Sequence, residues 1–280
     1  MLSVRFNQNS TACAITTHSG FVLYNINPFG AFYTSQIQVD IIELLYNTSL
    51  VAFSQKNQLT IKNIKRESII GEMQYKDVVK DVRMNRQYLV VSADHLYVYG
   101  MNDLKLIHKI ELTSTALFVL LDVHLIYTIK NVLILFNIQS LYPMYSITPH
   151  THSIHNLHAT SEFIFTCSER GTIIRQYSLS NGELTREYRR GLTGGNIVDL
   201  NYNDYLIVSS ENTVHFYTQN TTIGYSNVGI SVDTSYFHPT LKIKAGMIGF
   251  ADGKWLLFDM DGTLWVVQEQ TVIDKKTIQL

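Results

Sequence analysis

Cysteine is scarce in this chain. Its 280 residues include only two, Cys13 and Cys167. Each lies in an apolar, strand-like run (ACAI and FIFTC), which is typical of small buried side chains in a reducing compartment. The sequence does not exclude a disulfide between them but gives no support for one.

Segments for export or for membrane spanning are also missing. The opening MLSVRFNQNS has neither a basic region nor an uninterrupted apolar region, so we expect no secretory signal. The most apolar run, residues 116–136, has the length of a membrane span, but polar side chains divide it into strand-length pieces: Asp122, His124, Lys130 and Asn131.

Charged residues and prolines are few. Only 16% of the residues are charged and 46% are hydrophobic, which favours a large core and excludes a disordered chain. No linker-like stretch breaks the sequence, so we expect one domain over residues 1–280. Because 23 acidic residues nearly balance 22 Lys and Arg, no overall field attracts nucleic acid, and we expect no nucleic-acid partner.

Short runs of Val, Ile, Leu, Phe and Tyr recur along the chain, with no helical period. The turn residue that opens the most regular strand of each unit recurs at intervals of 37, 37, 37, 40, 41 and 41 residues. About forty residues is the length of four short strands with their turns, and such units arranged radially form a propeller. The sequence therefore predicts an all-β, seven-bladed β-propeller of four-stranded blades. The turn residues are Gly20, Asn57, Asp94, Asn131, Gly171, Asn212 and Gly253.

Catalytic motifs are not visible. The chain has no Gly-rich phosphate loop, metalloprotease helix motif or nucleophile elbow, so we expect no enzyme and no cofactor. Four histidines cluster in PHTHSIHNLH, but no cysteine or carboxylate completes a metal-ligand set nearby, so we expect no metal site. These histidines are His150, His152, His155 and His158.

Two adjacent arginines, Arg189 and Arg190, end a strand-like segment in the fifth unit. Successive side chains of a strand point to opposite faces, so the pair predicts two separate anion pockets at an exposed rim. Five of the nine arginines fall in this unit, and no lysine occurs between Asn131 and Leu241. The planar guanidinium binds phosphate oxygens in a bidentate manner, so this bias favours phosphate recognition.

Hydroxyl and imidazole side chains flank the arginine pair in sequence. Ser168 and Thr172 lie in CSERGT, and Ser209, Ser210, Thr213 and His215 lie in SSENTVH. Such residues at strand ends often form turns, but beside the arginines they indicate hydrogen-bond partners for a phosphorylated polyol.

No charged residue occurs between Glu211 and Asp233. Residues 219–232 combine small polar residues with larger side chains that suit a bilayer interface: Ile223, Tyr225, Val228 and Ile230. A membrane-contact loop and a plain fourth strand of the sixth blade both fit this stretch.

These segments together resemble the PROPPIN family of seven-bladed propellers. The resemblance rests on FNQNSTACAITTHSGFVLYNINPF, on DVRMNRQYLVVSADHLYVYGMNDLKLIHKI and on SERGTIIRQYSLSNGELTREYRRG. Tyr188 to Gly191 stand where the family has an aromatic or leucine followed by Arg-Arg-Gly. In this alignment Tyr188 packs and does not bind.

The resemblance implies binding of phosphatidylinositol 3-phosphate and phosphatidylinositol 3,5-bisphosphate. Arg189 would serve one rim site with His150, Ser168 and Thr172, and Arg190 a second site with Ser210, Thr213 and His215. It also implies a cytoplasmic monomer that attaches peripherally to autophagosomal precursor, endosomal or vacuolar membranes, with a blade-six loop, residues 219–232, inserted in the bilayer.

Two functions remain as hypotheses at this point. The first is a peripheral membrane protein that recruits autophagy or trafficking proteins to phosphoinositide-containing membranes. The second is a protein-interaction propeller that has lost lipid binding. An enzymatic propeller is a more distant alternative, which converging histidines and carboxylates in the central channel would favour.

Overall fold

A computed structural model describes residues 3–112, 115–191, 194–217, 223–225, 231–233, 240–242, 246–259, 261–268 and 271–277. These residues form 30 β-strands and no α-helix. In these ranges there is accordingly no helix long and apolar enough to cross a membrane. The apolar run at residues 116–136 folds instead as parts of three strands of one blade, as its interrupting polar residues predict.

The strands fall into seven consecutive blades. Blade one contains β1 (Ser3–Phe6), β2 (Ala12–Thr17), β3 (Gly20–Asn25) and β4 (Gly30–Ser35). Blade two contains β5 (Ile41–Leu44), β6 (Leu50–Gln55), β7 (Gln58–Asn63) and β8 (Ser68–Gln74). Blade three contains β9 (Asp81–Met84), β10 (Tyr88–Ser92), β11 (His95–Gly100) and β12 (Leu106–Glu111). Blade four contains β13 (Phe118–Leu121), β14 (His124–Ile129), β15 (Val132–Asn137) and β16 (Tyr142–Ile147).

The remaining blades follow in the same way, with one insertion. Blade five contains β17 (Ile154–Ala159), β18 (Phe163–Ser168), β19 (Ile173–Ser178) and β20 (Leu184–Arg189). Blade six contains β21 (Ile197–Tyr202), β22 (Leu206–Ser210), β23 (Thr213–Tyr217) and β26 (Thr240–Leu241). Its insertion carries β24 (Ile223–Tyr225) and β25 (Ser231–Asp233). Blade seven contains β27 (Met247–Ala251), β28 (Lys254–Phe258), β29 (Thr263–Gln268) and β30 (Thr271–Thr277).

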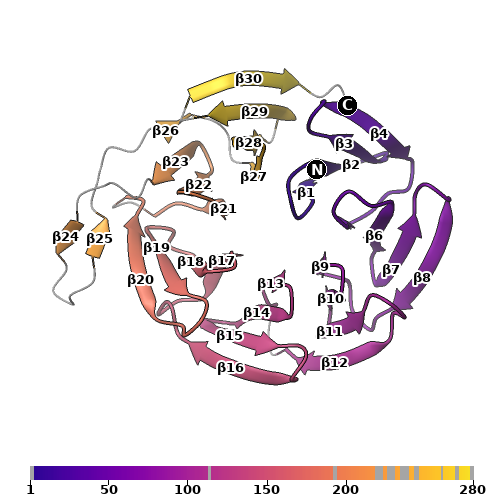
Figure 1. Cartoon of the computed structure of the whole chain (residues 1–280), viewed down its shortest axis with the longest axis horizontal. Coiled ribbons are helices and arrows are strands. Elements are labelled where there is room, and N and C mark those ends of the chain that lie inside the picture. Colours follow the sequence, from indigo (N-terminus) through magenta and orange to yellow (C-terminus); the bar gives the residue numbers. More distant parts are fainter. Residues whose placement is uncertain are drawn as a thin grey trace.

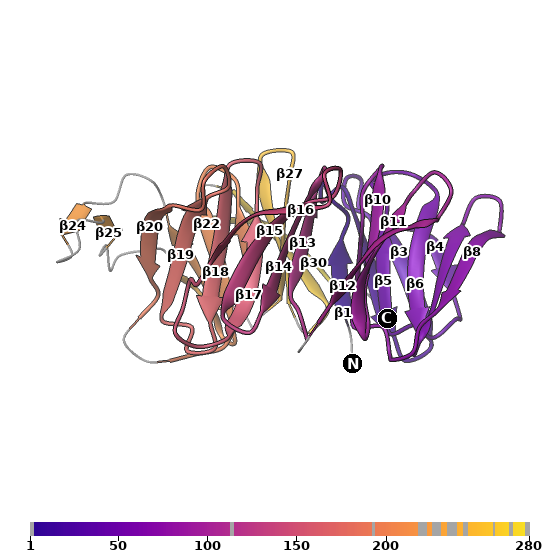
Figure 2. The same cartoon turned by 90° about the horizontal axis from the view of Figure 1, so that it is seen from below.

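The blades surround a central axis, with the first strand of each blade innermost (Figure 1). Seen from the side, they stand next to one another as a short cylinder (Figure 2). The predicted seven-bladed propeller is confirmed. One part of the repeat analysis is wrong. Gly253 opens β28, the second strand of its blade, whereas the other six turn residues precede third strands. The equivalent turn residue of blade seven is Gly262, which directly precedes the third strand β29. The insertion in blade six therefore makes the true last interval longer than the one that ends at Gly253.

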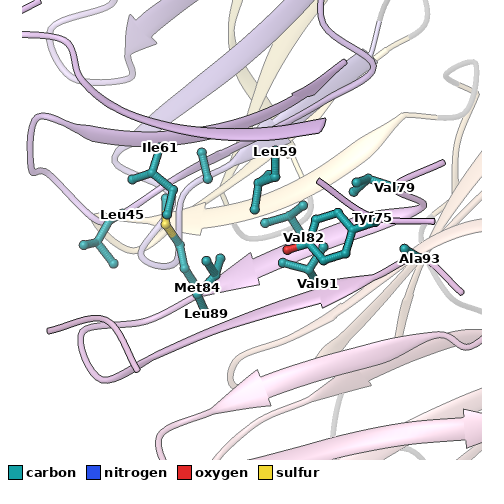
Figure 3. Packing of buried hydrophobic residues seen from close by; sticks show 11 residues of the cluster. Leu45, Leu59, Ile61, Tyr75, Val79, Val82, Met84, Leu89, Val91 and Ala93 are labelled. Atoms are coloured by element: carbon teal, nitrogen blue, oxygen red, sulfur yellow. The ribbon is translucent and has the colours of Figure 1, made fainter. Parts of the chain in front are cut away.

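Each seam between neighbouring blades encloses one hydrophobic cluster in the part of the chain that the structure describes. Figure 3 shows the cluster between blades two and three, where Leu59 and Ile61 meet Val82 and Leu89, all at most 1% exposed. Successive side chains of a strand point to opposite sides, so each blade packs one face into the seam with the preceding blade and the other face into the seam with the following blade. A blade therefore cannot bury both faces without two neighbours.

Asparagine side chains connect several blades at the inner strands. Asn7 Nδ2 donates a hydrogen bond to the Tyr46 carbonyl at 3.0 Å, which links blades one and two. Asn85, Asn156 and Asn201 donate in the same manner to carbonyls of the following blade, at 2.8, 3.0 and 3.0 Å. These bonds satisfy backbone carbonyls and fix the position of one blade against the next.

An ion-pair network joins three inner strands. The guanidinium of Arg5, on β1, donates to Asp81 Oδ1 at 2.6 Å, to Glu43 Oε2 at 3.2 Å and to the Val82 carbonyl at 2.8 Å. The side chain of Glu43 is only 4% exposed. Blades one, two and three are thus tied together by one largely buried cation.

The ring closes by packing between blade seven and blade one. Cys13 and Ile15 of β2 pack with Leu256, Phe258 and Leu264. All four strands of blade one come from one stretch of the chain, and so do all four of blade seven. No described strand is therefore exchanged between the first and the last blade. Cys13 and Cys167 are both free and buried.

The insertion of blade six joins the sheet of blade five. β25 pairs in parallel with β20, and β24 pairs with β25, so this sheet has six strands in the order β17-β18-β19-β20-β25-β24. Figures 1 and 2 show β24 and β25 projecting outward beyond β20. The fourth strand of blade six is β26 and not residues 219–232, so the plain-strand interpretation of that stretch is wrong. β25 pairs with Glu187 and Tyr188 at the outer edge of β20, just before the arginine pair.

Candidate functional site

The two arginines lie at the end of β20, on opposite faces of blade five. Arg189 pairs with Ile173 of β19, and Arg190 N donates to the Thr172 carbonyl at 2.9 Å. The neighbouring Tyr188 packs into the cluster between blades five and six. Strand alternation therefore directs Arg190 to the seam with blade six and Arg189 to the seam with blade four.

Tyr188 is a packing residue, as predicted. Its side chain is 2% exposed, and its hydroxyl donates to Gln176 Oε1 at 2.6 Å. Its ring meets Tyr217 of blade six at a centroid distance of 5.5 Å. The Arg186 guanidinium lies over the Tyr188 ring, 5.7 Å from its centroid. Tyr188 thus anchors the strand end that carries the arginine pair.

Arg190 is held against the backbone of two glycines. Its Nε donates to the Gly171 carbonyl at 2.6 Å. A Cβ on Gly195 would lie 2.5 Å from Arg190 Nη2, so the guanidinium occupies the space that a larger residue would fill. Gly171 has a φ of 59°, and a Cβ there would lie 2.0 Å from the Gly195 carbonyl oxygen. Gly171 therefore requires glycine, whereas a Cβ at Gly195 would displace the Arg190 guanidinium.

Polar groups of blade six face the same seam. Ser210 Oγ and Thr213 Oγ1 are 2.8 Å apart, and Thr213 Oγ1 is 3.0 Å from His215 Nε2. Val208, which pairs with His215, belongs to the cluster that contains Tyr188, so these side chains point toward blade five. The structure therefore brings Ser210, Thr213 and His215 together on the side of blade six that Arg190 faces.

The opposite face of blade five is arranged differently. Arg189 is half-buried, and its side chain makes no hydrogen bond or ion pair with the described residues. Ser168 lies two residues beyond Thr166 on β18, which places both side chains on this face. Thr172 lies opposite Arg190 and not Arg189, so its grouping with Arg189 rests on the resemblance alone.

His150 lies behind this surface. It is 7% exposed, and its Nε2 is 3.0 Å from Thr166 Oγ1. Next to it, Arg175 donates to Glu187 Oε1 at 2.5 Å and to the Pro149 carbonyl. Arg175 is thus used internally and not for a ligand. The other histidines of the cluster are dispersed, and in the described residues no three His, Cys, Asp or Glu side chains gather closely enough to hold a metal ion.

Sequence reasoning missed Gly195, Arg175 and Glu187. The register of the β19–β20 hairpin would have placed Arg175 opposite Glu187, because oppositely charged residues that face each other across strands usually pair. Gly195 had no comparable signal. Its contact with Arg190 depends on the path of the segment between blades five and six.

Burial lowers the pKa of His150 to about 4, and nearby Arg175 acts in the same direction. Its imidazole is neutral at pH 7 and can offer hydrogen bonds but no charge. The unfolded chain, with a histidine pKa near 6.5, binds more protons below pH 6.5 than the folded chain does. Stability is therefore lost as the pH falls from about 6.5 toward 4.

We expect the His150→Gln variant to lose less stability than the wild type on transfer from pH 7 to pH 5. Glutamine keeps a neutral partner for Thr166 but does not titrate. The difference should be about 1–2 kcal/mol in the free energy of unfolding, measured by urea denaturation. Identical pH profiles for the two proteins would show that folding does not lower the pKa of His150.

The structure describes only two of the four proposed membrane-contact residues, and of these only the backbone. Ile223 and Tyr225 are the two ends of β24, and no side-chain position is described there. Val228 and Ile230 lie outside the described residues. All four belong by sequence to the insertion, whose described strands β24 and β25 project from the rim.

The family model of the PROPPINs matches residues 1–228. The chain belongs to the PROPPIN family. Curated relatives include Autophagy-related protein 18 of Mycosarcoma maydis, 28% identical over 86% of this chain and 64% of that protein. The protein of the same name from Yarrowia lipolytica is 29% identical over 76% of this chain and 65% of that protein. The chain thus spans slightly under two thirds of the length of these two relatives.

Solved structures agree with the PROPPIN fold. Kluyveromyces lactis Hsv2 superposes with a TM-score of 0.83 at 19% identity, covering 100% of this chain and 99% of that chain. A complex of KlAtg21 with the coiled coil of AgAtg16 gives 0.81 at 22% identity, with 99% of each chain covered. At this level of identity the superpositions show a shared fold.

Proposed function

We propose that this PROPPIN is a peripheral membrane protein that binds phosphatidylinositol 3-phosphate and phosphatidylinositol 3,5-bisphosphate at two rim sites. The observation that carries the proposal is the placement of Arg189 and Arg190 on opposite faces of one strand, each toward a different seam. One guanidinium per seam provides planar, bidentate donors for the oxygens of one phosphate group.

The two sites differ in the groups around the arginine. In the seam with blade six, Arg190 shares the phosphate with the hydroxyls of Ser210 and Thr213 and with His215, which are already hydrogen-bonded to one another. In the seam with blade four, Arg189 acts with Ser168, while buried His150 supports Thr166 behind them. A preformed hydrogen-bonded chain costs little ordering when the ligand arrives, so the Arg190 site should bind more tightly.

Flotation of the protein with liposomes tests this function. Liposomes of neutral lipid with a few per cent phosphatidylinositol 3-phosphate should carry the protein upward, and the same liposomes with unphosphorylated phosphatidylinositol should not. Equal recovery, or no recovery, with both would contradict the proposal. The second outcome would favour a propeller that binds only proteins.

The bound protein would then recruit autophagy or endolysosomal trafficking proteins at cytoplasmic membrane surfaces. The relatives named for autophagy and the KlAtg21 complex with a coiled coil support a role as a recruiting scaffold and not as an enzyme. We propose that it acts as a monomer, because a single chain presents both seams.

The insertion of blade six should add apolar contact with the bilayer. The net charge of −1 provides little attraction to an anionic surface, so two headgroup sites need further support. Changing both Ile223 and Tyr225 to Asp should weaken liposome binding about tenfold or more. Binding of soluble inositol 1,3-bisphosphate should stay unchanged.

Replacement of Ile223 and Tyr225 by Val and Phe, which keeps both side chains apolar and adds no charge, is a suitable control. An equal loss in the liposome and the soluble-headgroup assays would mean that the aspartates damage the blade. No loss in either assay would mean that the insertion stays outside the bilayer.

A further inference from the structure

A cavity lies on the central axis of the propeller. Its volume is about 250 Å³, and the first strand of every blade lines it: β1, β5, β9, β13, β17, β21 and β27. These strands surround the axis in Figure 1. A water molecule takes about 30 Å³ in the liquid, so the cavity has room for several waters or for one small organic molecule. None of the residues assigned to the two rim sites lines it.

Arg83 of β9 gives this cavity a positive charge. Its Nε lies 3.4 Å from Asp81 Oδ2, but this buried atom makes no hydrogen bond with the described residues. The side chain is 36% exposed and lines the cavity. Arg5 differs, because Asp81, Glu43 and the Val82 carbonyl accept its hydrogen bonds. The guanidinium of Arg83 matches a carboxylate, which accepts two parallel hydrogen bonds from such a planar group.

Asp199 of β21 gives the same cavity a negative charge. Its carboxylate accepts hydrogen bonds from Leu200 N at 2.9 Å and from Ile248 N at 2.7 Å, one on each oxygen. Burial raises the pKa of Asp199 to about 6, although these hydrogen bonds and Arg83 act in the opposite direction. The carboxylate is therefore mainly ionised at pH 7. Each oxygen has a further lone pair, which an ammonium group can use.

The two charges belong to separate parts of the ring. Blades four and five lie between blade three, which carries Arg83, and blade six, which carries Asp199 (Figure 1). Their part of the cavity wall is mainly apolar: Val119, Leu120, Leu121, Leu157 and Ala159. His158 of blade five is the exception. Burial lowers its pKa to about 4, and Arg83 acts in the same direction, so the imidazole is neutral at pH 7.

We propose that the central cavity binds a small ω-amino acid, which has a carboxylate at one end, an ammonium group at the other and a short hydrocarbon chain between them. The carboxylate pairs with Arg83, the ammonium group pairs with Asp199, and the hydrocarbon chain lies along the apolar wall of blades four and five. A simple anion would also face Asp199, and a simple cation would also face Arg83. A molecule with both charges therefore matches the cavity better than either.

Isothermal titration calorimetry of the wild type with 4-aminobutyrate, 5-aminopentanoate and 6-aminohexanoate tests the need for both charges. Hexanoate and hexylamine, each of which lacks one charge, are the matched controls. Because a lost charge-assisted hydrogen bond weakens binding about tenfold or more, the best amino acid should bind at least that much more tightly than either control. Equal affinity for hexanoate would overturn the proposal. So would failure of all three amino acids to bind, or tighter binding of L-leucine, whose two charges share one carbon.

Single replacements locate the site. Arg83→Gln and Asp199→Asn should each weaken binding of the best amino acid about tenfold or more. Arg86→Gln and Asp204→Asn are the matched controls and should bind as the wild type does. Neither control residue lines the cavity, and the Arg86 guanidinium lies over the Tyr46 ring, 5.2 Å from its centroid. A similar loss in the controls would overturn the assignment of the site.

Circular dichroism and the urea midpoint of each variant show whether it is folded. If Asp199→Asn fails to fold, Arg83→Gln and the wild-type ligand series still decide the question. Wild-type affinity of folded Arg83→Gln would overturn the proposal. These measurements use no lipid, so their outcome does not depend on the proposed function.

Discussion

Replacing both Arg189 and Arg190 by Thr is expected to abolish most binding to liposomes that contain phosphatidylinositol 3-phosphate, whereas each single replacement leaves one site active. Charge-assisted hydrogen bonds contribute about 1.5–3 kcal/mol each, so loss of one bidentate arginine should weaken its site by about tenfold or more. The two residues face different seams, so their effects should be nearly independent. Titration of each variant with liposomes measures this directly.

Arg186→Thr is the matched control. It removes the same charge from the same strand, but the Arg186 guanidinium lies over the Tyr188 ring. It should bind liposomes almost as the wild type does. A similar loss in Arg186→Thr would mean that overall charge, and not the two sites, governs binding. Complete loss in either single variant would mean that the two arginines serve one site.

Replacing Arg5 by Ala is expected to destabilise the propeller by about 3–5 kcal/mol, because it leaves buried carboxylates without their cation. Burial raises the pKa of Glu43, and the attraction of Arg5 only partly offsets it. At the more exposed Asp81, burial also raises the pKa, but the charges of Arg5 and Arg83 and the hydrogen bonds from Arg5 and the Val82 backbone together lower the pKa overall. Urea denaturation at pH 7 should show the loss.

The pH dependence gives this prediction a second check. Without Arg5 the pKa of Glu43 rises further, so the folded chain binds more protons than the unfolded chain above the usual glutamate pKa. Stability of the variant therefore falls as the pH rises through that range, and its deficit should be smaller at pH 5 than at pH 8. Lys62→Ala, which removes a pair with the exposed Glu67, should cost at most about 1 kcal/mol. Equal costs for the two variants would contradict the role assigned to the Arg5 network.

The blade count was predictable from the sequence because each blade needs the same strands and turns. Lys130 and Asn131 illustrate the limit, since this turn between β14 and β15 predicts that a strand follows but not which residues it contacts across the seam. Gly253 shows how a periodic signal can mislead. It continues a regular spacing by coincidence, because the insertion shifts every later strand along the chain.

The opposite orientation of the two arginines was also predictable, since strand alternation is local. Long-range geometry was not. The burial of His150 behind Thr166 and the approach of Gly195 to Arg190 depend on how blades pack. The pairing of β25 with β20 depends on the free edge of a neighbouring blade, which no spacing within blade six encodes.

The closure between blades seven and one bears on how the chain is made. Blade one emerges first from the ribosome and can pack against blade two as soon as that blade follows. Its other face, with Cys13 and Ile15, stays uncovered until Leu256 and Phe258 of blade seven are synthesised, after the other six blades. Because no strand of blade one is held back to complete blade seven, the nascent blade can form its own sheet early. One apolar face then stays uncovered through most of synthesis, which makes it the surface where a chaperone would act.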